Sequence, residues 1–166
     1  MPSAVLSANA VAVAAGVSKN WVYRAIDIGV LSEPCFAADA VVLRVYRVLS
    51  QFAWPDKPKQ RSVKQKPDTW LLAALNAVRD AASDEKTTPE TTLYVLGTAV
   101  HIANTRTERA LLEASGPEGT EPSALDAQVA IRLPIGRWID ELPSVLAKTP
   151  RHAPRRGVPP RQPAAS

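Results

Sequence analysis

Apolar residues recur at helical spacing on both sides of one glycine near the start of the chain, and they predict two short helices over residues 7–15 and 18–27. The residues that would face each other across this pair are Val11, Ala12, Ala15, Val22, Ala25 and Ile26. Most of them are small, which lets two helices cross closely. Gly16 supplies the permissive backbone of a helix end, and Ser18 is a favourable N-cap for the second helix. This pattern is typical of a helix-turn-helix.

The polar residues of the second predicted helix are left on its outer face. They are Ser18, Lys19, Asn20, Tyr23 and Arg24, and each side chain carries a hydrogen-bond donor. A recognition helix presents such side chains to base edges and phosphates in the major groove of double-stranded DNA. We therefore predict that these five residues bind DNA. The alternative is an ordinary helical hairpin with a polar face.

A third helix is predicted from an N-cap at Asp39 to about Phe52, with an apolar face that would close a small core against the first two helices. Residues 55–67 then form a Pro-rich segment with almost no apolar side chains. Such a composition predicts a domain boundary. We assign residues 1–54 to a DNA-binding domain and residues 55–67 to a basic linker.

The first 52 residues also resemble a known family. The motifs that carry the resemblance are Ala12 with Gly16-Val17-Ser18, then Gly29-Val30-Leu31, then Phe36-Ala37-Ala38-Asp39-Ala40-Val41. They are similar to those of the MerR-type winged helix-turn-helix family of DNA-binding domains. The resemblance covers about residues 5–52 and implies a bacterial or phage regulator whose recognition helix begins near Ser18. The segment between Leu31 and Phe36 is shorter than the usual wing, which brings the related winged helices of excisionases into consideration.

Residues 68–83 predict an amphipathic helix with Asp68 as a candidate N-cap. Its apolar face would comprise Trp70, Leu71, Leu72, Leu75 and Val78. In MerR-like regulators the segment after the DNA-binding domain is often a dimerisation helix, so this face could join two copies of the chain. Packing inside the core of its own domain is the interpretation that we favour.

The stretch 91–104 is open to two interpretations. Its Thr, Val, Ile and Tyr content favours two strands joined by a hairpin turn at Gly97-Thr98. A helix is the alternative, because Thr88-Pro89-Glu90 could start one and helical spacing relates Leu93, Leu96, Val100 and Ala103. A capping box of Thr105 and Glu108 predicts that a helix begins near residue 106, which favours strands before it.

Residues 127–133 alternate between apolar and polar and predict a further strand. Pro134 then opens a helix that Pro143 is expected to break or kink near its end. The apolar face of that helix would comprise Ile135, Trp138, Ile139 and Leu142.

The predicted fold class is therefore α+β, mainly α. It combines the N-terminal domain with a small α+β domain over residues 68–148, or an all-α domain if 91–104 is helical. Residues 149–166 lack apolar periodicity and are rich in Pro and Arg, so we predict a disordered basic tail there.

Positive charge is concentrated in two segments. Residues 57–66 and residues 148–166 each contain five basic and no acidic residues, whereas residues 67–147 contain twelve acidic and six basic residues. Basic segments attract phosphate backbones without reading sequence, although they also serve simply to keep a chain in solution. The predicted phosphate contacts of the linker are Lys57, Lys59 and Arg61.

The sequence carries no recognisable catalytic or metal-binding constellation. Cys35 is the single cysteine, which excludes an internal disulfide and fits a reducing cytoplasm. His101 and His152 are too few and too scattered to form a zinc site with it. No nucleotide-binding or nucleophile-elbow motif occurs. We expect no enzyme activity and no cofactor. There is no apolar run long enough to span a membrane and no signal-peptide pattern, so we expect a cytoplasmic protein.

Three hypotheses of function follow. The leading one is a sequence-specific DNA-binding transcription regulator, with repression as the default, whose acidic domain supplies homodimerisation, a protein partner or a small effector. Trp70 and Trp138 could line an effector pocket between sheet and helices, or pack as core. The second is an excisionase-like architectural factor of a phage or mobile element. The third is an antitoxin-type interaction module whose acidic domain neutralises a basic partner protein.

Overall fold

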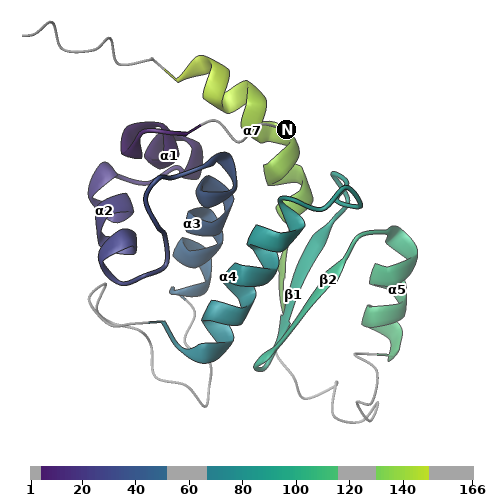
Figure 1. Cartoon of the computed structure of the whole chain (residues 1–166). Helices are drawn as coiled ribbons and strands as arrows, with labels where there is room; N and C mark the ends of the chain where they lie inside the picture. Colours follow the sequence, from purple (N-terminus) through teal and green to yellow (C-terminus); the bar gives the residue numbers. More distant parts are fainter. Residues whose placement is uncertain (1–4, 52–66, 116–129, 150–166) are drawn as a thin grey trace, which may run out of the picture.

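The computed structural model of the chain describes residues 5–51, 67–115 and 130–149 (Figure 1). Its elements are α1 Ala8–Ala15, α2 Lys19–Asp27, α3 Ala37–Leu49, α4 Thr69–Ala81, β1 Thr92–Leu96, β2 Ala99–Ala103, α5 Arg106–Ser115, β3 Ala130–Leu133 and α7 Ile135–Lys148. The fold is α+β and mainly helical, with a three-stranded antiparallel sheet. This confirms the coarse prediction of an α+β, mainly α class.

The turn between α1 and α2 is built by the glycine that the sequence singles out. Gly16 has a left-handed φ of 67°, which costs a side-chain-bearing residue energy and glycine very little. The N–H of Gly16 donates to the carbonyl of Val13 (3.1 Å), and the N–H of Val17 donates to that of Ala12 (2.9 Å). These two bonds form a Schellman motif, which satisfies the last carbonyls of α1 and fixes the direction of the chain into α2.

The end of α2 repeats the same arrangement. Gly29 has a φ of 79°, and its N–H donates to the carbonyl of Ile26 (3.0 Å). The N–H of Val30 donates to the carbonyl of Ala25 (2.8 Å), so this end is also a Schellman motif. Both ends of the pair are therefore fixed by local backbone bonds, and the helices have nearly the predicted bounds.

An N-cap at Asp39 would place the first residue of α3 at Ala40, but the helix begins three residues earlier, at Ala37. Asp39 lies inside the first turn, and its carboxylate accepts the N–H of Phe36 at 2.8 Å. Asp39 thus satisfies the helix start from within the helix, and the prediction that it is the N-cap was wrong. The helix also ends at Leu49 instead of continuing to about Phe52.

The segment between α2 and α3 contains no β-hairpin in residues 28–36 of the described chain. Its backbone pairing is an isolated bridge between Leu6 and Cys35, in which the N–H of Leu6 donates to the carbonyl of Cys35 at 2.8 Å. The bridge ties the chain before α1 to the chain before α3. The wing that the family resemblance implies is therefore not formed at this position.

The stretch 91–104 is a β-hairpin. Strands β1 and β2 pair antiparallel with Leu96 opposite Ala99, which leaves Gly97 and Thr98 as the two-residue turn. Gly97 has a φ of 59°, as the predicted turn requires. The strand interpretation is confirmed, and the all-α alternative for the C-terminal half was wrong.

Strand β3 pairs with the other edge of β1 and gives the order β2-β1-β3. Side chains that alternate along the strands make one face of the sheet apolar. The residues of that face are Leu93, Val95, Val100, Ile102, Ile131 and Leu133. In Figure 1, α4 lies on one side of the sheet and α5 on the other.

Helices α5 and α7 begin where the sequence predicts. The N–H of Glu108 donates to Oγ1 of Thr105 (3.1 Å), and the N–H of Thr105 donates to the Glu108 carboxylate (3.3 Å), which confirms the capping box of α5. Helix α7 follows Pro134 and continues through Pro143 to Lys148, with a bend visible in Figure 1. Of the two expected effects of Pro143, a break or a kink, the structure therefore shows the kink.

One apolar core joins the N-terminal helices to the C-terminal half. Helix α4 packs against both α3 and the sheet, so its apolar face lies in a core that both halves share and not, as predicted, in a core of the C-terminal domain alone. The buried residues of α4 are Trp70, Leu71, Ala74, Leu75, Val78 and Ala81. Leu72, which was expected on this face, is 38% exposed. Asp68 is at the N-cap position but makes no side-chain cap bond.

Two arginines reinforce this junction. The Arg79 guanidinium of α4 donates to the carbonyl of Val30 at 3.0 Å and lies 3.6 Å from the buried Asp39 carboxylate of α3. The Arg44 guanidinium of α3 lies 4.2 Å from the ring centroid of Trp138 on α7. The helix-turn-helix pair is therefore held against the C-terminal elements by polar contacts as well as by apolar packing.

Several predictions concern residues that the structure does not describe. Residues 52–66, which include most of the predicted linker, and residues 150–166 of the predicted tail lie outside the described ranges. Within the ranges that are described, no helix has the length and apolarity needed to cross a membrane.

Candidate nucleic-acid interface

The five predicted DNA-binding residues lie together on α2 and its N-cap, and all of them are exposed. They are Ser18, Lys19, Asn20, Tyr23 and Arg24. On the opposite face Val22 and Ala25 are fully buried. This separation follows from the helical period, which places residues three or four apart on one side. In Figure 1, α2 lies at the edge of the molecule away from the sheet, so the described C-terminal elements leave its outer face uncovered.

The start of α2 is suited to an anion. Ser18 occupies the N-cap with an extended backbone, and its side chain makes no cap hydrogen bond, so the hydroxyl is not committed to the helix. The first turn contains no acidic residue. Free N–H groups and the positive end of the helix dipole favour a phosphate at such a position. Lys19 in the same turn adds a full positive charge.

The outer face of α2 combines cations with an aromatic ring. The Lys19 ammonium lies 5.4 Å from the ring centroid of Tyr23, which is within the range of a cation–π contact. Among the described residues, neither Lys19 nor Arg24 has a carboxylate within 4.0 Å. Asp27, at the far end of the helix, is also exposed. The charges of Lys19 and Arg24 are therefore available to a polyanion.

Arg47 of α3 holds the turn that sets the position of α2. Its guanidinium donates to the carbonyl of Gly16, across a separation of 31 residues in the chain. This bond adds to the Schellman motif and fixes the turn from the side of α3. The predictions from the sequence include no role for Arg44 or Arg47. No local pattern in the sequence indicates these roles, because each contact joins residues far apart in the chain.

The three remaining predicted DNA contacts, Lys57, Lys59 and Arg61, lie outside the described residues. Their proposed phosphate contacts stay a prediction from composition.

The other residues considered for chemistry, Cys35 and His101, lie in surroundings that fit a structural role. In the described ranges, no group of three or more His, Cys, Asp or Glu side chains could hold a metal ion. Cys35 is buried, and burial, followed by the charges of Asp39 and Glu33, raises the pKa of its thiol. His101 is half-buried, and its Nε2 has no hydrogen-bond partner within the described part of the chain. A raised thiol pKa disfavours the reactive thiolate.

A polar cluster fastens α5 to the sheet. The Tyr94 O–H and the Arg132 guanidinium each donate to Oε1 of Glu113 at 2.7 Å. These hydrogen bonds lower the pKa of the Glu113 carboxyl, while burial, followed by the bond to Glu113, raises the pKa of Tyr94. The cluster holds its carboxylate ionised and its phenol protonated, which suits a structural link.

Both tryptophans considered for an effector pocket pack against protein. Trp70 is 8% exposed and belongs to the core cluster, and Trp138 packs against that core beneath Arg44. A groove is present at a different place, between α1, α3 and α7. The predicted location of an effector pocket between sheet and helices thus finds no support from these two residues.

Comparisons of the chain with protein-family models, with curated proteins and with solved structures found no match.

Proposed function

We propose that the protein is a sequence-specific DNA-binding regulator that inserts α2 into the major groove of double-stranded DNA. The observation that carries the proposal is the exposed outer face of α2, on which every predicted contact residue carries a hydrogen-bond donor. The same helix buries its apolar side in a helix-turn-helix closed by α3. An α-helix of this kind fits the major groove, where each base pair presents a distinct pattern of donors and acceptors.

The proposed contacts divide into two kinds. Asn20, Tyr23 and Arg24 lie on the exposed body of α2 and would read base edges. An amide pairs well with adenine and a guanidinium pairs well with guanine, so Asn20 and Arg24 are the residues proposed to set sequence preference. Ser18 and Lys19, at the N-terminus of the helix, would hold phosphate. The linker residues Lys57, Lys59 and Arg61 would add phosphate contacts that do not depend on sequence.

The proposed biological role is control of transcription, with repression as its simplest form. A protein that occupies a promoter blocks polymerase without any further machinery. The C-terminal half shares a core with α3, so it would move with the DNA-binding helices as one unit. We propose that it presents a surface to a second copy of the chain, to a partner protein or to an effector.

Selection of bound fragments from random duplex DNA tests the proposal. The full chain is incubated with the library at about 50 mM and about 150 mM salt, because non-specific phosphate binding weakens steeply over this range. A shared motif that survives at the higher salt is the expected result, and a symmetric motif would indicate binding as a dimer. Fragments with no shared motif that are lost at the higher salt would contradict sequence-specific recognition.

A further inference from the structure

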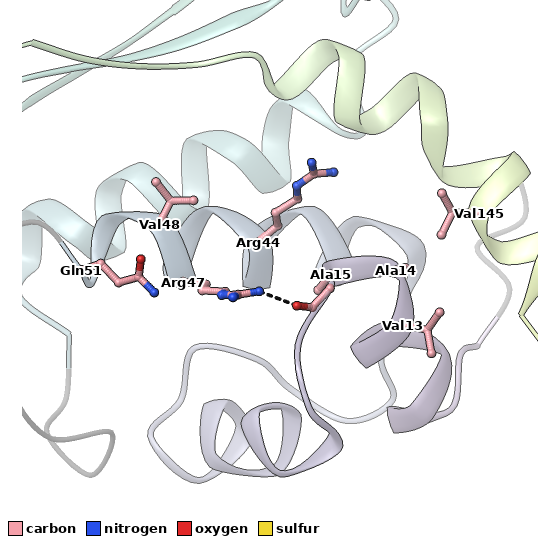
Figure 2. A pocket seen from close by; sticks show the side chains of 9 residues that line it. Val13, Ala14, Ala15, Arg44, Arg47, Val48, Gln51 and Val145 are labelled. Atoms are coloured by element: carbon pink, nitrogen blue, oxygen red, sulfur yellow. Dashed lines mark hydrogen bonds between the residues drawn. The ribbon is translucent and has the colours of Figure 1, made fainter.

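A groove of about 510 Å³ lies between α1, α3 and α7 (Figure 2). Apolar side chains that line it include Val13, Val48 and Val145, and polar ones include Arg44, Arg47 and Gln51. Figure 2 shows Val145 on α7 across from α3, so the C-terminal half supplies one wall and the helix-turn-helix supplies the other. The groove therefore adjoins the turn that sets the position of α2.

The groove carries uncompensated positive charge. The Arg47 guanidinium is held by the Gly16 carbonyl, and the Arg44 guanidinium lies over the Trp138 ring. Both contacts leave donors free, because a guanidinium has five N–H groups. Among the described residues no carboxylate lies within 4.0 Å of either arginine, and no acidic residue lines the groove. Two cations that line one groove and have no anionic partner there favour an anionic ligand.

The walls favour a ligand with an apolar body as well. Val13 is 48% exposed, although a valine on a helix beside the core would gain by being covered. Val48 and Val145 extend this apolar surface on the other two helices. The volume also lies in the range of small-molecule sites, which combine apolar walls with a few polar groups. A bare DNA phosphate would leave the apolar surface uncovered.

We propose that this groove binds a small organic anion, in which a carboxylate or phosphate group pairs with Arg44 and Arg47 and an apolar chain covers Val13, Val48 and Val145. Because Arg47 also holds the Gly16 carbonyl, an occupant that draws this guanidinium away changes the constraint on the turn before α2. Occupancy then alters DNA affinity, a second claim that rests on the proposed function. Binding of the anion itself does not rest on it.

The first experiment titrates the full chain with hexanoate and, separately, with hexyl phosphate while amide NMR shifts are recorded. Hexanol and acetate serve as probes that carry only the apolar chain or only the charge. We expect saturable shifts at Gly16, Arg47 and Val145 with one or both amphipathic anions, and much weaker shifts with hexanol and acetate. The stronger of the two anions identifies the headgroup.

Two variants on one helix provide a matched comparison. Val145→Glu places a carboxylate in the groove, whereas Ala147→Glu places the same charge at an exposed position of α7. Val145→Glu should weaken hexanoate or hexyl phosphate binding about tenfold or more, because the new carboxylate competes for the two arginines, and Ala147→Glu should change it less than about twofold. If Val145→Glu fails to fold, Arg47→Gln takes its place, with the exposed Arg106→Gln as control.

The site would be overturned by the absence of saturable shifts for both anions, by shifts confined to other elements, or by equal effects of the paired variants. Loss of DNA affinity in Arg47→Gln with unchanged anion binding would reassign Arg47 to a phosphate contact and would also overturn it.

The coupling claim has its own readout. DNA affinity is measured with and without a saturating amount of the bound anion, and anion affinity is measured with and without DNA. Linkage requires the same fold-change in both directions. Anion binding with no fold-change in DNA affinity refutes the coupling alone. Anion binding by a chain that binds no DNA refutes the proposed function and leaves the anion site standing.

Discussion

Replacing Arg79 with methionine tests whether the helix-turn-helix is fixed to the C-terminal half by polar contacts. The guanidinium donates to the Val30 carbonyl at 3.0 Å and pairs with Asp39 at 3.6 Å. Val30 belongs to the Schellman motif that ends α2, and Asp39 satisfies the start of α3. Methionine keeps the apolar stem of the side chain but removes every donor. Arg79 also donates to Oδ1 of Asn76 at 3.2 Å, an exposed bond within α4. The loss should therefore comprise this bond and the two contacts across the junction.

The magnitude follows from burial on each side of the pair. A hydrogen bond from a charged donor contributes about 1.5–3 kcal/mol, and removing one partner of a fully buried ion pair costs about 3–5 kcal/mol. The Asp39 side chain is 7% exposed, but that of Arg79 is 39% exposed, so solvent screens part of the interaction. Asp39 also keeps its bond from Phe36. We expect Arg79→Met to lower the free energy of unfolding by about 2–3 kcal/mol.

Urea unfolding followed by tryptophan fluorescence measures the effect. The matched control is Arg137→Met on α7, which removes a pair with Glu141 in which the arginine side chain is 72% exposed. The control should cost less than about 0.5 kcal/mol. Hydrogen exchange at the Val30 N–H should also accelerate in Arg79→Met, because this amide belongs to the loop that Arg79 holds. If both variants unfold at the same urea concentration and Val30 exchange is unchanged, the account of the junction is refuted.

Three further predictions concern separate parts of the molecule. Gly136→Ala should destabilise the chain by at least about 1–3 kcal/mol in urea unfolding, because a Cβ there would lie 1.9 Å from the Thr88 carbonyl oxygen; wild-type stability would contradict this close approach. Glu113→Gln should make the free energy of unfolding fall less steeply as the pH is lowered, because hydrogen bonds from Tyr94 and Arg132 lower the pKa of Glu113. The contribution of Glu113 to the free energy of unfolding is then present above the ordinary pKa of 4.5 and disappears as the pH falls through the lowered pKa. If Glu113→Gln leaves the dependence of the urea midpoint on pH unchanged, Glu113 does not have this role. Replacing Lys57, Lys59 and Arg61 with glutamine should weaken binding to all duplexes alike and reduce the salt slope by about 0.9 per lost phosphate contact in anisotropy titrations, whereas an altered sequence preference would show that these residues read bases.

Local chemistry accounts for what the sequence predicts well. The turns at Gly16 and Gly97 and the capping box of Thr105 and Glu108 each depend on a few neighbouring residues. Their conformations follow from backbone preferences that a short stretch reveals. The outer face of α2 is predictable for the same reason, because helical periodicity separates its polar from its apolar side chains.

The features that the sequence does not predict depend on contacts between distant segments of the chain. The bond from Arg47 to Gly16 and the stacking of Arg44 on Trp138 join residues far apart in the chain, so no local pattern indicates them. The exposure of Leu72 likewise depends on where α4 meets α3 and the sheet. Asp39 was misplaced because an acidic residue serves a helix start either from the N-cap or from inside the first turn, and only the structure distinguishes the two.

The central claim is that α2 reads DNA sequence, and parallel selections with the wild type, Arg24→Ala and Arg106→Ala test it most directly. Arg24 lies on the outer face of α2, whereas Arg106 is an arginine of α5 with an 84% exposed side chain, so the two variants lose the same charge. At about 150 mM salt, we expect wild type and Arg106→Ala to select one motif and Arg24→Ala to lose discrimination at one position of it, by about 1–3 kcal/mol. The same motif from all three proteins, or no motif from the wild type, would contradict the claim.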